Sequence, residues 1–179
     1  VHEAEELIAL AKNKNLVLSV FQNRRYDSDF KTVQKMVHEG KLGKIVEAAI
    51  YFDRYNLNLS PKQHKETTNP GAGLLHDLGP HIIDQALQLF GMPQSVFGIL
   101  RVQRPLSLVN DYFAAQLFYT GLTVSVKASL IVKEPPAAYT IHGMNGSFVK
   151  QRADTQEDML KLGKLPAGDD WGLEPGSAA

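Results

Sequence analysis

The feature that most constrains the fold is a series of short strand-like segments in the second half of the chain. The run from Leu122 to Leu130 alternates apolar and polar side chains, as a strand with one buried face does. The segments of strand length are Val96–Gln103, Asp111–Tyr119, Leu122–Val132, Ala138–His142 and Ser147–Lys150. The turns Tyr119-Thr120-Gly121 and Met144-Asn145-Gly146 suit hairpins, and the second carries the Asn-Gly pair that tolerates positive φ. The sequence therefore predicts a large, mostly antiparallel sheet.

The first half of the chain predicts helices interleaved with two strands. In chain order we expect a helix from the first residues, a strand at Leu16–Gln22, a helix from 28 to 40, a strand at Ile45–Tyr55, a polar loop at Asn56–Ala72 and a helix ending near Phe90. Helices on one face of an open sheet give a two-layer α+β fold. The other face then meets solvent or a second subunit, and its small, hydroxyl and apolar side chains predict a homodimer or a dimer of dimers.

The composition limits the classes of partner that the protein is expected to bind and the compartment in which it is expected to lie. The 179 residues suit one domain, and 19 Lys and Arg balance 19 Asp and Glu, so no net charge favours nucleic acid or an anionic membrane. No apolar stretch reaches the roughly 18 residues that span a bilayer, and the first residues lack a signal-peptide pattern. The absence of cysteine agrees with a reducing compartment. We therefore expect a cytoplasmic protein with no nucleic-acid or membrane partner.

A line of polar side chains follows the third predicted helix. At about 100° per residue, Asp77, His81, Asp84 and Gln88 fall in one narrow stripe of an otherwise apolar helix. Burying unpaired charges is costly, so these groups must face a cavity or pair with partners. Pro80 lacks a backbone donor, which predicts an irregular helix start near Gly79.

Three readings of this stripe are open from spacing alone. It is a buried His–Asp pair that only satisfies polar groups, a metal site, or a site of proton transfer. A metal site needs three or more ligands, and the remaining histidines show no paired spacing, so we predict no metal ligands. The spacing does not decide between the other two.

The runs GAGLLHDLGPHIIDQALQLFG, SVFQNRRYDSDF and HEGKLGKI resemble the second domain of the Gfo/Idh/MocA oxidoreductases, the family of glucose-fructose oxidoreductase and inositol dehydrogenase. The likeness covers roughly the first 150 residues. It implies a fold like the C-terminal domain of glyceraldehyde-3-phosphate dehydrogenase, a large sheet that holds a sugar or polyol and forms dimers. It also implies NAD or NADP, bound mainly by an N-terminal Rossmann domain.

The resemblance assigns roles to individual residues. His81 corresponds to the catalytic base that takes a hydroxyl proton while hydride leaves for the nicotinamide, and Asp77 to the acidic residue that binds substrate and orients that histidine. Asn23 and Arg24 are expected near the cofactor. The expected substrate-binding residues are Tyr26, Arg54, His64 and Asp84.

The chain departs from the family in having no glycine-rich dinucleotide fingerprint after a strand. The family's lysine in a Glu-Lys-Pro motif is also missing. We therefore expect residues 1–179 to be the substrate-binding and dimerisation domain of an NAD(P)-dependent oxidoreductase, separated from its Rossmann domain and inactive alone. The alternatives are a non-catalytic binding or assembly module, and a metal-dependent lyase or isomerase using His81, Asp77 and Asp84.

Overall fold

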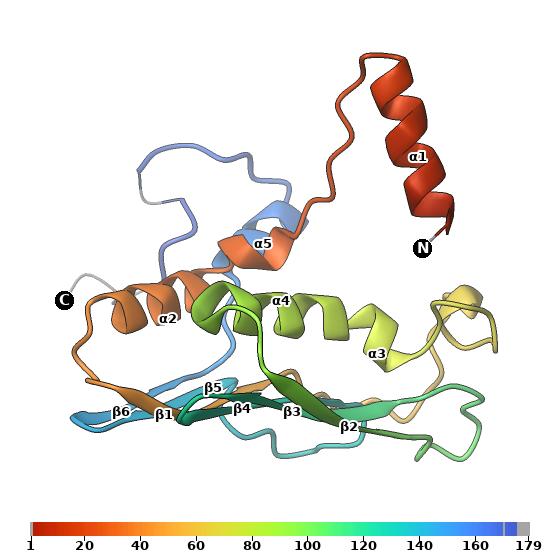
Figure 1. Cartoon of the computed structure of the whole chain (residues 1–179). Coiled ribbons are helices and arrows are strands. Elements are labelled where there is room, and N and C mark those ends of the chain that lie inside the picture. The colour runs from red at the N-terminus through yellow and green to blue at the C-terminus, as the bar shows by residue number, and fades with distance from the viewer. Residues whose placement is uncertain (1, 170, 175–179) are drawn as a thin grey trace.

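A six-stranded sheet, covered on one face by helices, forms the body of the molecule (Figure 1). The computed structural model describes residues 2–169 and 171–174. The strands are β1 Ile45–Tyr51, β2 Ser95–Arg101, β3 Tyr112–Tyr119, β4 Leu122–Ser129, β5 Tyr139–Gly143 and β6 Gly146–Lys150. Their order across the sheet is β2-β3-β4-β1-β5-β6, and every pairing is antiparallel except that of β1 with β4, which is parallel. The predicted two-layer α+β fold is confirmed.

Two helices supply most of the layer that packs on the sheet. The helical segments are α1 His2–Asn13, η1 Asn23–Tyr26, α2 Ser28–His38, η2 Gln63–Lys65, α3 Leu74–Asp77, α4 Gly79–Phe90 and α5 Thr155–Lys161. Phe30 of α2 and Ile82 of α4 are fully buried against the sheet. The alternation in β4 is as predicted, because Val124 and Val126 are buried in this core while the residues between them lie on the other face. Burial of this apolar surface is the main force that holds the two layers together.

The third predicted helix is two helices, as the position of Pro80 suggested. Asp77 is the last residue of α3, and α4 begins at Gly79 with a proline in its first turn. The missing donor of Pro80 falls where a helix start leaves backbone N–H groups unpaired in any case. The break places Asp77 and His81 on either side of a bend, so the stripe is less regular than an unbroken helix would make it.

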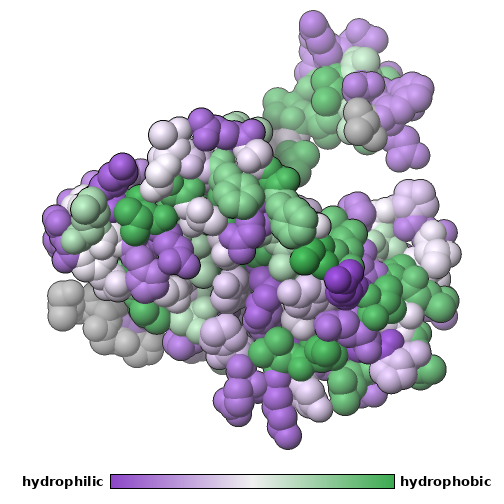
Figure 2. All heavy atoms as spheres, turned by 60° about the horizontal axis from the view of Figure 1, so that its bottom comes forward, coloured by the Kyte–Doolittle hydropathy of each residue, from purple (hydrophilic) through white to green (hydrophobic). Residues whose placement is uncertain are grey.

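The predicted strand at Leu16–Gln22 is wrong, because these residues form no strand. They run as an extended connection with highly exposed apolar side chains, and Val17 is 97% exposed. A strand needs a neighbour for its backbone hydrogen bonds, and this segment leads away from the sheet to α1 (Figure 1). Helix α1 forms as predicted, but none of its residues is buried. Hydrophobic surface is visible on this detached part of the molecule in Figure 2.

Helix α5 was not predicted from the sequence, although its start carries a recognisable signal. Asp154 caps it by accepting a hydrogen bond from the backbone N–H of Glu157 at 3.1 Å, the pattern of an acidic cap followed three residues later by glutamate. Of the expected irregular C-terminal run, 169–179, residues 170 and 175–179 lie outside the described part of the chain.

Candidate active site

The junction of α3 and α4 holds the two residues predicted to be catalytic. Asp77 forms an ion pair with Lys65, which η2 carries at the end of the long loop. His81 lies in the first turn of α4, and its Nδ1 atom is buried without a hydrogen-bond partner in the described residues. The direct hydrogen bond expected between Asp77 and His81 is therefore absent at Nδ1, and the nearest binding partner of Asp77 is a lysine. Sequence reasoning gave Lys65 no role.

Burial determines the protonation state of His81. Burial lowers the pKa of its imidazole from the ordinary value of 6.5, and the positive charge of Arg24 lowers it further. The negative charges of Asp77 and Asp84 act in the opposite direction, and Lys65 adds a smaller lowering effect. An imidazole with a depressed pKa is neutral near pH 7, which is the form that can accept a proton.

Asp84 fixes the turn η1 onto α4. Both of its carboxylate oxygens accept hydrogen bonds from Arg25, at 2.7 and 2.6 Å, in the bidentate arrangement that arginine favours. The amide of Gln85 donates to the backbone carbonyl of Arg24 at 3.0 Å. Asp84 is thus engaged in holding η1, and its expected contact with substrate stays a prediction.

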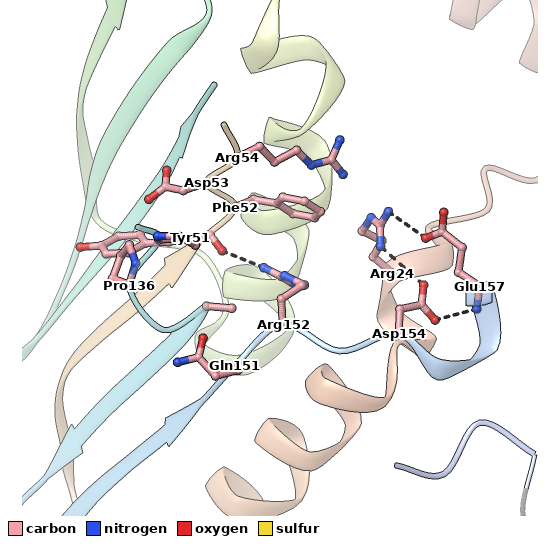
Figure 3. A pocket seen from close by; sticks show the side chains of 12 residues that line it. Arg24, Tyr51, Phe52, Asp53, Arg54, Pro136, Gln151, Arg152, Asp154 and Glu157 are labelled. Carbon is pink, nitrogen blue, oxygen red and sulfur yellow. Dashed lines mark hydrogen bonds and ion pairs between the residues drawn. The ribbon is translucent and has the colours of Figure 1, made fainter. Parts of the chain in front are cut away.

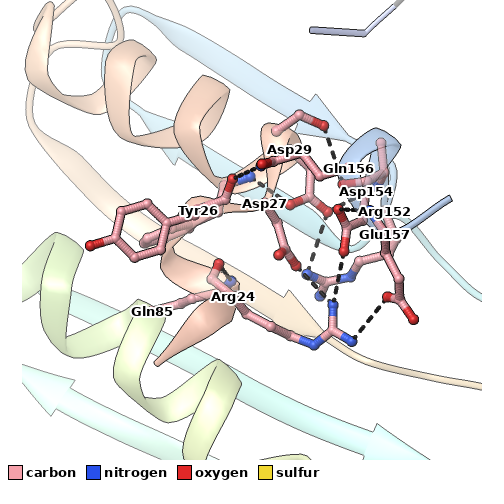
Figure 4. Close-up of polar contacts among 12 residues, drawn as sticks. Arg24, Tyr26, Asp27, Asp29, Gln85, Arg152, Asp154, Gln156 and Glu157 are labelled. Atoms are coloured by element: carbon pink, nitrogen blue, oxygen red, sulfur yellow. Dashed lines mark hydrogen bonds and ion pairs between the residues drawn. The ribbon is translucent and has the colours of Figure 1, made fainter. Parts of the chain in front are cut away.

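Arg24 points inward from η1, and Asn23 and Tyr26 are exposed (Figure 4). The guanidinium of Arg24 donates to Asp27 at 2.9 Å and lies 3.7 Å from both Asp154 and Glu157. The last two residues belong to the start of α5, so this helix is tied to the predicted cofactor segment. Burial raises the pKa of the Asp27 carboxyl to about 6.

A buried ion network shapes the loop that carries Lys65. Arg104 is almost fully buried and contacts Glu66 at 2.9 Å and Asp111 at 3.1 Å. It also donates to the carbonyl of Asn58 at 2.8 Å. Since Glu66 follows Lys65 directly, the network fixes the backbone that places Lys65 beside Asp77.

Asn110 lies between β2 and β3, in the segment that also carries Arg104, and it bonds to the start of α3. Its backbone carbonyl and its side chain accept hydrogen bonds from Leu74 N at 2.7 Å and Leu75 N at 2.8 Å. Gly73 precedes them with a φ of 88°, and a Cβ there would lie 2.4 Å from the Asn110 amide. Only glycine fits this conformation and this approach.

Two cavities of about 290 Å³ each open beside these groups. Asp77 and Lys65 line one of them, together with Arg54. Arg24 and Arg54 line the other (Figure 3). Neither cavity is lined by the other predicted site residues, which are Asn23, Tyr26, His64, His81 and Asp84. His64 is exposed on the outside of the loop.

The comparisons with known proteins identify the family. The model of the GFO/IDH/MocA C-terminal domain matches residues 30–149. The chain belongs to this family. It is 41% identical over 172 residues to the oxidoreductase YdgJ of Escherichia coli, covering 96% of this chain and 49% of YdgJ. It is 39% identical over 172 residues to IolW of Bacillus subtilis, named scyllo-inositol 2-dehydrogenase (NADP(+)), covering 96% and 48%. The predicted family is confirmed.

Solved structures give the same result for the fold of this family member. The oxidoreductase YPO2259 of Yersinia pestis matches with a TM-score of 0.85 at 40% identity, over 97% of this chain and 48% of its own. The oxidoreductase yvaA of Bacillus subtilis matches with a TM-score of 0.84 at 38% identity, over 98% and 49%. The chain spans about half the length of the curated relatives it matches.

Two further findings concern the described residues alone. None of the helices in 2–169 and 171–174 is long and apolar enough to cross a membrane. Within the same residues, no group of three histidine, cysteine or acidic side chains is arranged to hold a metal ion.

Proposed function

We propose that this chain is the substrate-binding and dimerisation domain of an NAD(P)-dependent oxidoreductase that converts a secondary alcohol of a sugar, inositol or related polyol into a ketone. The observation that carries the proposal is the neutral, partly buried His81 beside the Asp77–Lys65 pair, in a member of an oxidoreductase family. The relative IolW, whose name records scyllo-inositol and NADP(+), supports the substrate class.

In this proposal His81 takes the proton of the substrate hydroxyl. Its depressed pKa keeps the imidazole free of a proton near pH 7, and the carboxylates of Asp77 and Asp84 stabilise the imidazolium once the proton arrives. The ion pair with Lys65 holds the side chain of Asp77 at the cavity wall. NAD or NADP, when bound, would supply the acceptor for the hydride that leaves the same carbon.

We expect this chain to make few contacts with the coenzyme. Asn23 is exposed and Arg24 is engaged by three carboxylates, and no glycine-rich fingerprint follows a strand. We therefore assign most coenzyme contacts to an N-terminal Rossmann domain in the longer protein. The exposed apolar side chains of α1 and of 16–21 provide a surface for it.

The face of the sheet opposite the helices is the proposed dimer interface. Its central strands present small and hydroxyl side chains, and Phe97 of β2 and Val149 of β6 expose apolar surface toward its edges. Such a flat face suits a twofold contact between identical sheets. A cytoplasmic location remains our expectation from the cysteine-free sequence.

The test is kinetic, in the protein that carries this chain together with a dinucleotide-binding domain. His81→Ala should lower kcat by about 10²–10⁴-fold, the usual effect of losing a positioned base, with little change in melting temperature. Asp77→Asn keeps the shape of the side chain but removes its charge, so turnover should fall while folding survives. The matched control is His38→Ala, at an exposed histidine at the end of α2. Unchanged turnover in folded His81→Ala would end the catalytic assignment.

A further inference from the structure

Three arginines surround the aromatic ring of Phe52 (Figure 3). Their guanidinium carbons lie close to the ring centroid, at 4.4 Å for Arg152, 4.7 Å for Arg54 and 5.1 Å for Arg24. All four residues line one cavity of about 290 Å³. Cations over an aromatic face are attracted to it, but the three like charges repel one another.

Two of these arginines have their charges balanced by carboxylates. Arg24 pairs with Asp27 and lies near two further acidic side chains. Arg152 lies 3.4 Å from Asp29 and donates hydrogen bonds to the hydroxyl of Tyr139 and to a backbone carbonyl. These two are held in place as parts of the fold.

Arg54 is different, because its guanidinium makes no ion pair and no hydrogen bond with any described residue. Its backbone is well fixed, since its N–H donates to the carbonyl of Ser129 at 2.8 Å and its own carbonyl accepts from Val132 at 3.0 Å. Burial lowers its pKa, and the positive charge of Arg24 lowers it further. Arg54 is exposed, so its guanidinium is an accessible cation that has no carboxylate partner and lies near two other guanidiniums.

The nearby carboxylates do not supply the missing partner. Asp53 is buried and pairs with Lys127 at 2.9 Å, and Asp77 pairs with Lys65. Glu157 lies 2.9 Å from Lys161. The Nε atoms of Arg24 and Arg152 are also buried without an acceptor. The residues that line this cavity thus include an unpaired guanidinium, that of Arg54, and two arginines with a buried Nε that lacks an acceptor.

We propose that this cavity is an oxyanion-binding site in which Arg54 is the principal ligand. A carboxylate or a phosphate placed against Arg54 gains charge-assisted hydrogen bonds and relieves the repulsion among the three guanidiniums. Because Arg54 also lines the cavity of Asp77, the oxyanion belongs either to an acidic sugar substrate or to a dinucleotide phosphate. The choice between these two sources rests on the proposed function, whereas anion binding by Arg54 is measured without hydride transfer, so the two proposals can fail separately.

The test is calorimetric titration of the chain with four probes, namely inorganic phosphate, glucuronate, glucose and NADP⁺. The variants are Arg54→Met, Arg54→Lys and the control Arg101→Met, an exposed arginine that lines neither cavity. Arg54→Met leaves the backbone bonds of Arg54 intact, so the variant should fold. We expect phosphate and glucuronate to bind more tightly than glucose, and Arg54→Met to weaken them by about tenfold or more.

Arg54→Lys should retain part of the affinity for phosphate and glucuronate. Lysine keeps the positive charge but lacks the planar set of N–H donors that lets a guanidinium bind an oxyanion through two hydrogen bonds. If glucuronate binds tightly and NADP⁺ does not, the source is the substrate, and the reverse result assigns the site to the coenzyme. Binding that prefers neither anion over glucose, or that is equal in the wild type and Arg54→Met, overturns the proposal. So does the absence of any binding at millimolar concentrations, and so does an equal loss in Arg101→Met.

Discussion

Replacing Arg104 by methionine should loosen the loop that carries Lys65 and destabilise the whole domain. Arg104 is 4% exposed and Asp111 is 1% exposed, and Glu66 completes the network. Removing one member of a buried ion network leaves uncompensated charge and costs about 3–5 kcal/mol. Asp111 keeps two backbone donors, at 2.7 and 2.8 Å, so the loss should lie near the lower value. In a domain of this size that corresponds to a fall in Tm of about 6–12 °C.

The assay is urea denaturation of the wild type, Arg104→Met, Glu66→Gln and the double variant. The double variant should lose less stability than the two single losses added together, because both remove the same ion pair. Arg101→Met, an exposed arginine on β2, is the control and should change the free energy of unfolding by less than about 0.5 kcal/mol. If Arg104→Met is as stable as Arg101→Met, the network does not hold the loop.

Three further predictions concern single side chains. Lys65→Met removes a positive charge that lowers the pKa of His81, so an NMR titration should show that pKa rising, and an unchanged value would place Lys65 outside the site. Burial raises the pKa of Asp27 from 3.8 to about 6, so the folded chain binds this proton more tightly than the unfolded chain. Stability relative to Asp27→Asn should therefore fall by roughly 3 kcal/mol as the pH rises from about 3 to about 7, and a difference that is flat with pH contradicts this. Ser125→Glu puts like charges at the centre of the proposed sheet-to-sheet dimer, so light scattering should report a smaller particle than for the wild type, whereas equal sizes would argue against that interface.

The sheet could be predicted because its signals are local. Val124 and Val126 alternate with polar residues on a period of two, and that period alone sets which face is buried. The segment at Leu16–Gln22 has the same composition as a strand, yet it has no neighbouring strand to complete its hydrogen bonds. The apolar, β-branched sequence of this segment therefore indicated a preference for extended backbone, but it did not indicate whether another strand would pair with it.

The site was only partly predictable, for the opposite reason. His81 and Asp77 stand only four residues apart, so their proximity follows from their closeness in the sequence even though the helix is broken between them. The partners that define their environment come from distant segments, as Arg104 and Glu66 do at a separation of 38 residues. No local pattern marks such pairs, so Arg104, Arg152 and the pairing of Lys65 with Asp77 appeared only in the folded structure. Arg24 and Arg54 were predicted as site residues, but not as neighbours of Phe52.

The parallel pairing of β1 with β4 has a consequence for how the protein folds. Residues 52–121 separate these two neighbouring strands in the sequence. They include the loop of Lys65, both helices of the site, β2 and β3. Contacts between segments so far apart carry a large loop-closure entropy and slow the crossing of the folding barrier. We expect the hairpins β3–β4 and β5–β6 to form first, with the central strand docking last. The candidate site would then be assembled in the final step of folding.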